Sequence, residues 1–189
     1  MKIWYTKQGL WTLFLMCAVL LHLWALMLIF RDMSWVTERS NAWDALGVAA
    51  YGLVFTLVES AGLFLCAVLM GFLTPKKWSV DKRVAFLSLL VLLAALWAIL
   101  GQLGFLVNFT PPEAIMRSLA ESGHPVRNMY IFALIIVTLS VLLPAFWMAR
   151  AERAVETARP VIDRLSVLAV FYLVFDAIGL IVLVIRNVA

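Results

Sequence analysis

The chain has 189 residues, of which 65% are hydrophobic and only 14% are charged. Soluble domains are about a quarter charged, so this composition excludes a soluble fold and indicates an integral membrane protein surrounded by lipid. The net charge of +4 comes from basic residues at the ends of apolar segments. No basic face with interleaved aromatic residues lies outside them, so we expect no nucleic-acid partner.

Five apolar stretches are each long enough to cross a bilayer as a helix, which takes about 20 residues. They are continuous rather than alternating, which excludes the strands of a membrane β-barrel. The sequence therefore predicts one all-α membrane domain over 1–189. It is a bundle of five transmembrane helices at about 9–30, 45–73, 84–109, 129–149 and 165–186.

Basic residues divide unequally between the two ends of these helices. Ten lie at one end: Lys2, Lys7, Lys76, Lys77, Lys82, Arg83, Arg150, Arg153, Arg159 and Arg164. Five lie at the other end: Arg31, Arg39, Arg117, Arg127 and Arg186. By the positive-inside rule the amino terminus is cytoplasmic and the carboxyl terminus is outside. We expect a multi-pass protein of a bacterial or archaeal cytoplasmic membrane.

Helix ends carry local signals. Asn41 and Asp44 are predicted to cap the start of the second span. The fourth helix is predicted to continue past Arg150 to Ala158 and to end before Pro160, because proline disfavours helical backbone in the residue before it.

The outer loop between the third and fourth spans is predicted to hold a short helix. Residues 110–113 (TPPE) are typical of a capping box with proline in the first turn, and Gly123 and Pro125 would end the helix. We therefore expect a helix over 111–122 that lies on the membrane surface. The alternative is a lid over a site that opens outward.

The second span places small residues and one carboxyl group on a single helix face. Its members recur at alternating steps of four and three: Ala45, Ala49, Gly52, Thr56, Glu59, Leu63 and Cys66. Similar stripes run along one face of three other spans: the first (Ala18, His22, Ala25), the third (Ala94, Ala98, Gly101, Gly104, Asn108) and the fifth (Ala169, Tyr172, Asp176, Gly179). Small residues let membrane helices approach closely, so we expect all these faces to point into the bundle.

Three ionisable side chains, those of His22, Glu59 and Asp176, lie near the centres of their spans. An ionisable group at membrane depth is costly and marks a candidate functional site. We expect a single polar cluster that serves as a proton or ion site. Its predicted members are His22, Glu59, Asp176, Tyr172, Gln102 and Asn108.

No lysine or arginine lies near the level of this predicted cluster. Two carboxylates in a low-dielectric environment cannot both stay ionised cheaply. We therefore expect a protonated carboxyl, a cation between the two carboxylates, or an imidazolium at His22. The structural alternative is a protonated carboxyl that only joins helices by hydrogen bonds.

The sequence shows no catalytic constellation. One histidine and two carboxylates could hold a divalent metal, but no H-E-x-x-H motif supports one. We predict no catalytic residue, no metal ligand and no cofactor, and we expect a non-enzymatic role.

Three functions are consistent with these features. The first is a non-catalytic subunit or accessory protein of a membrane complex, packed against a larger membrane protein. The second is a small proton- or cation-coupled transporter or channel that uses the intramembrane carboxylates and forms a homo-oligomer. The third is a membrane-embedded enzyme.

Overall fold

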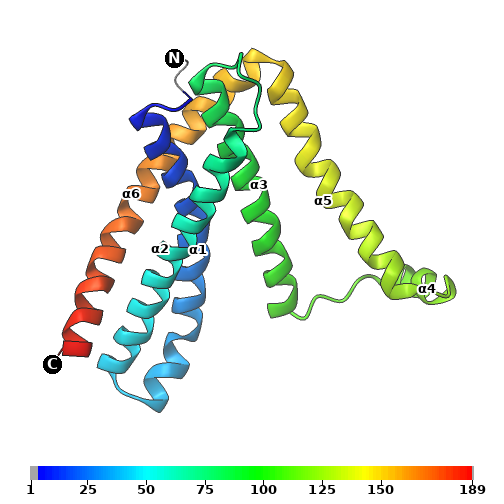
Figure 1. Ribbon diagram of the computed structural model, residues 1–189. Helices are drawn as coiled ribbons and strands as arrows, with labels where there is room; N and C mark the ends of the chain where they lie inside the picture. Colours follow the sequence, from blue (N-terminus) through cyan, green and yellow to red (C-terminus); the bar gives the residue numbers. More distant parts are fainter. Residues whose placement is uncertain (1–3, 189) are drawn as a thin grey trace.

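The structure is a computed structural model that describes residues 4–188. All regular secondary structure in this range is helical (Figure 1). The six helices are α1 (Lys7–Arg39), α2 (Ala42–Gly71), α3 (Val80–Leu106), α4 (Glu113–Glu121), α5 (Pro125–Arg150) and α6 (Glu152–Val188). All but α4 are long and apolar enough to cross a membrane, which confirms the prediction of five apolar spans.

Two of the long helices extend well beyond the predicted spans. α6 has 37 residues and α1 has 33. At 1.5 Å per residue α6 is about 55 Å long, whereas the hydrocarbon core is about 30 Å thick. The polar residues at the start of α6 and the end of α1 therefore have room to project past the apolar layer.

The junction between α5 and α6 differs from the prediction. α5 ends at Arg150, Ala151 is extended (φ −103°, ψ 118°), and α6 runs from Glu152 through Pro160. The expected helix end before Pro160 is therefore wrong. Proline removes one backbone hydrogen bond, and in this exposed polar turn the freed carbonyl can bind water instead.

The predicted short helix is present as α4, although it starts differently. Its N-cap is Pro112, with no side-chain hydrogen bond, so the expected capping box does not form. Gly123 follows with a φ of +72°, the left-handed conformation that glycine adopts easily, and the helix ends there as predicted. No residue of α4 is buried, and within the described chain α4 packs only against α5.

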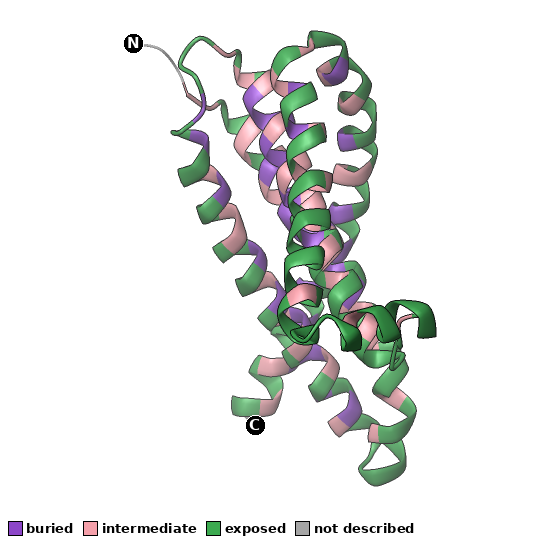
Figure 2. Ribbon diagram, turned by 90° about the vertical axis from the view of Figure 1, so that its right-hand side faces the viewer, coloured by how far each residue is buried: buried purple, intermediate pink, exposed green. Residues whose placement is uncertain are grey.

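The bundle is closed at one end and open at the other. α1 is central and packs against α2, α3 and α6. The buried residues of α3 stop at Ala95, and those of α5 are only Ala145 and Met148. Figure 1 shows α3 and α5 diverging from the end that holds the start of α1 and the α5–α6 junction. In Figure 2, α5 lies towards the viewer and is mostly exposed.

The closed end is fastened by a buried arginine, Arg83, which is 2% exposed. Its Nε donates to Thr74 Oγ1 (2.7 Å), its Nη1 donates to the Trp4 carbonyl (2.6 Å), and its guanidinium lies over the Trp4 ring. Nη2 donates to the Pro75 carbonyl at 3.4 Å. Arg83 therefore ties the amino-terminal segment to the α2–α3 loop and is buried, although the sequence groups it with the basic residues at the helix ends.

Candidate functional site

His22 on α1 and Asp176 on α6 form a sealed ionisable pair. His22 Nε2 lies 2.9 Å from Asp176 Oδ2 and 3.1 Å from Oδ1, and the two residues are 0% and 1% exposed. Tyr172 stacks against the imidazole with ring centroids 6.0 Å apart. Three of the predicted site residues are therefore brought together.

Small residues allow the helices to approach closely enough for this contact. Ala169 on α6 and Ala18 on α1 are fully buried. A Cβ on Gly179 would lie 3.4 Å from the Ala50 carbonyl oxygen of α2, so the α6 backbone touches α2 directly. The predicted inward faces of the first and fifth spans are confirmed for these residues.

The hydrogen bonds of His22 fix how many protons the pair holds. His22 Nδ1 lies 2.8 Å from the Ala18 carbonyl oxygen, which can only accept, so Nδ1 carries a proton. The contact between Nε2 and Asp176 then requires one further proton. The pair is then either an imidazolium beside a carboxylate or a neutral imidazole beside a carboxylic acid. Both forms are electrically neutral, which lowers the cost of burying the pair.

Glu59 lies apart from this pair, contrary to the single cluster that the sequence suggested. Its side chain is exposed, and within residues 4–188 it makes no hydrogen bond or ion pair. The residues that α2 buries follow a different set of positions: Ala45, Gly47, Ala50, Leu53, Thr56, Ser60, Ala67 and Gly71. Because α2 is rich in small residues on both faces, their spacing could not identify the packed face.

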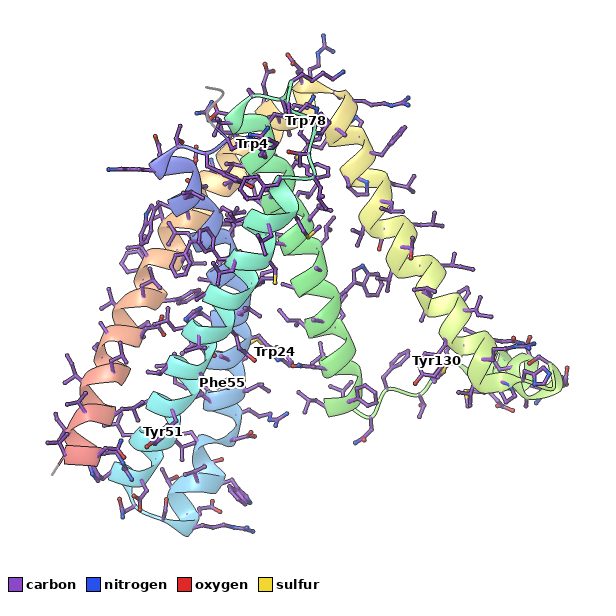
Figure 3. The ribbon with its side chains drawn as sticks, in the orientation of Figure 1. Trp4, Trp24, Tyr51, Phe55, Trp78 and Tyr130 are labelled. Carbon is purple, nitrogen blue, oxygen red and sulfur yellow. The ribbon has the colours of Figure 1, made fainter. Side chains whose placement is uncertain are left out.

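Glu59 lines a cavity of about 530 Å³ that is formed by α1, α2 and α3. α2 contributes Gly52, Phe55, Thr56, Glu59 and Leu63, α1 contributes Leu21, Trp24, Ala25, Leu28 and Ile29, and α3 contributes Gln102. The Trp24 indole N–H donates to Gln102 Oε1 and so bridges α1 and α3. Figure 3 shows Trp24 in the space between these helices and Phe55 on α2.

Two further cavities adjoin this one along α2, one on each side. A second cavity of about 180 Å³ shares Leu28, Ile29 and Gly52 with it and extends to Ala45. A third cavity of about 200 Å³ shares Leu63 and extends to Met70. We call the three together the Glu59 groove. All seven residues of the stripe predicted on the second span line it.

The groove and the sealed pair are separate features of the structure. His22, Tyr172 and Asp176 line none of the three cavities that make up the Glu59 groove. The ionisable residues at similar depth therefore divide into a closed site and an open one.

Two further predictions about α3 are wrong. Asn108 lies just after the helix, exposed, with a φ of +49°, a left-handed conformation that asparagine tolerates. It is a helix-end residue and lines none of the groove cavities. The expected contact stripe is also open, because a Cβ on Gly101 or Gly104 would meet nothing within 4 Å.

Three polar contacts were missed by the sequence analysis. The first is the contact of the buried Arg83 with Thr74, Trp4 and Pro75 at the closed end. The Trp97 indole N–H donates to Ser140 Oγ (2.8 Å) and joins α3 to α5. Arg186 donates to Asp44 (2.9 Å) and joins α6 to α2. Gly47, one turn from Asp44, leaves room for the Arg186 side chain, because a Cβ there would lie 2.6 Å from the guanidinium carbon. A glycine at this position is the sequence feature that pointed to the contact.

No metal centre or relative gives this chain a function. Across residues 4–188, no group of three or more histidine, cysteine, aspartate or glutamate side chains is placed to hold a metal ion. Comparison with protein-family models, curated proteins and solved structures found no match to this chain. The His22–Asp176 pair and the Glu59 groove are therefore the features from which a function is inferred.

Proposed function

We propose that this chain is a non-catalytic subunit or accessory protein of a membrane complex. The observation that carries this proposal is the position of Glu59, exposed near the middle of α2 on a small-residue face. Within the bilayer this carboxyl group would contact lipid, where an ionisable group is costly. A second membrane protein packed against α2 would remove it from lipid and would use the small residues for close helix contact.

The proposal includes a topology. In this topology the five long helices span the membrane with the amino terminus inside and the carboxyl terminus outside. The membrane that holds the protein would be the cytoplasmic membrane of a bacterium or archaeon. The ten-to-five division of basic residues supports this orientation. α4 would lie on the outer membrane surface, with Ile115, Met116 and Leu119 towards the lipid.

A second candidate is a small proton- or cation-coupled transporter. The single proton shared by His22 and Asp176 favours it, because proton relays in membranes use histidine and carboxylate side chains. The burial of both residues, away from the Glu59 groove, supports the subunit function ahead of transport.

The two candidates predict different assemblies in native membranes. The tagged full-length chain would be crosslinked in native membranes and extracted in mild detergent. Native mass spectrometry would then give the mass of the assembly. We expect a stoichiometric complex with a different membrane protein. A discrete homo-oligomer as the only assembly would overturn the subunit proposal, and proton or cation flux in reconstituted vesicles would then favour transport.

A further inference from the structure

The Glu59 groove has the length of a transmembrane helix. From Ala45 to Met70 it follows 25 residue steps of α2, which is about 37 Å at 1.5 Å per residue. The hydrocarbon core is about 30 Å thick, so the groove is long enough to cross its whole depth. A small ligand at Glu59 would need only the central cavity, whereas a helix would use all three.

The floor of the groove suits close helix packing. Ala45, Ala49 and Gly52 present little side-chain bulk over its first two turns. A Cβ on Gly52 would approach Ile29 Cδ1 to 3.3 Å, so larger side chains on this floor would intrude on the space between α1 and α2. Faces of this kind allow the backbones of two membrane helices to approach closely.

The carboxyl group of Glu59 limits the chemistry of the occupant. Lysine and arginine are absent from 8–30, 40–75, 84–116, 128–149 and 165–185, which include the centres of all five long helices. The one histidine at that depth, His22, is buried against Asp176. A second copy of this chain therefore has no cation to place opposite Glu59. Only a different chain can supply it.

We propose that the Glu59 groove binds a single transmembrane helix of a different membrane protein, and that this helix carries a lysine or arginine opposite Glu59. The proposal rests on the proposed function, since it names the partner chemistry of the subunit. Glu59 and the partner cation would neutralise each other out of contact with lipid, and the small-residue floor would set the helix position.

Synthetic transmembrane peptides test this proposal without the native partner. Two Leu/Ala peptides of about 23 residues, one with a central lysine and one with leucine there, would be labelled with an acceptor fluorophore. The full-length chain would carry a donor at its carboxyl terminus in phosphatidylcholine vesicles. We expect energy transfer to show that the lysine peptide binds about tenfold more tightly, in line with polar helix contacts in membranes.

Matched variants locate the interaction. Glu59→Gln should remove the preference for lysine, whereas Glu38→Gln, the same change on an exposed carboxyl outside the groove, should keep it. Gly52→Leu should weaken the binding of both peptides by filling the floor, and Ala177→Leu on an exposed face of α6, outside the groove, should weaken the binding of neither.

Four results in vesicles would overturn the proposal. They are equal binding of the two peptides to the unchanged chain, full lysine preference in Glu59→Gln, unaltered binding in Gly52→Leu, and self-association of this chain that depends on Glu59. A native heteromeric complex that survives Glu59→Gln would also overturn it, while leaving the proposed subunit function intact. A purely homo-oligomeric state in native membranes would contradict the proposed subunit function, whatever preference the peptides show.

Discussion

His22 and Asp176 face each other between α1 and α6, share one proton and are sealed by Tyr172 and small residues. Glu59 lies near the middle of the neighbouring α2 but faces an open groove and meets no partner within the described chain. The first arrangement is complete within one chain, so it can stabilise the isolated fold. The second leaves a carboxyl without a partner in the described chain, so no contact of Glu59 stabilises the isolated fold.

The largest expected effect is at the sealed pair. Asp176→Ala leaves His22 buried without its partner, which should lower the free energy of unfolding by about 3–5 kcal/mol. Asp176→Asn should cost far less, about 1 kcal/mol, because its amide can donate to Nε2 of the neutral imidazole. Unfolding in mixed detergent micelles would measure both. Equal damage from the two variants would contradict the single shared proton.

Glycines on the two sides of the molecule should respond differently to a larger side chain. Gly179→Leu should lower the free energy of unfolding by about 1–3 kcal/mol, because α6 is in contact with the α2 backbone there. Gly101→Leu on α3 should change it by less than about 0.5 kcal/mol, since nothing lies within 4 Å. Unfolding in mixed detergent micelles would measure both changes. A large loss of unfolding free energy in Gly101→Leu would show that this face of α3 is packed against another helix.

The open end depends on one side-chain hydrogen bond between α3 and α5. Trp97→Phe removes the bond to Ser140 and should cost about 0.5–1.5 kcal/mol while letting α5 move further from α3. Spin labels on these two helices, read by double electron–electron resonance, would report the separation. An unchanged distance distribution would mean that packing at Ala145 and Met148 alone positions α5.

The smallest expected effect is at Glu59. In the isolated chain Glu59→Gln should change the free energy of unfolding by less than about 0.5 kcal/mol, because no contact is lost. Glu38→Gln serves as the control for a lost surface charge. Destabilisation by Glu59→Gln comparable to that of Asp176→Ala would place Glu59 inside a polar network of its own chain.

The sequence was sufficient to predict five apolar helices, the short helix near 111–122, the Asn41 cap and the meeting of His22 with Asp176. Each of these depends on segment length, local capping or the depth of a rare charge. The packed face of α2 was not predictable, because small residues follow two of its faces and only the positions of α1 and α6 select one. Asn108 was misassigned because a polar helix-end residue and a polar site residue look alike in sequence.

Carboxyl modification tests the contrast between the closed pair and the open groove most directly. A hydrophobic carbodiimide, which reacts with protonated carboxyl groups from the lipid phase, would be applied to the purified chain in vesicles at mildly acidic pH. Mass spectrometry would then map the adducts, with Glu59→Gln as the control. The structure predicts modification at Glu59, protection by the lysine peptide and no modification at Asp176. Modification of Asp176 as fast as Glu59, or an unreactive Glu59, would contradict it.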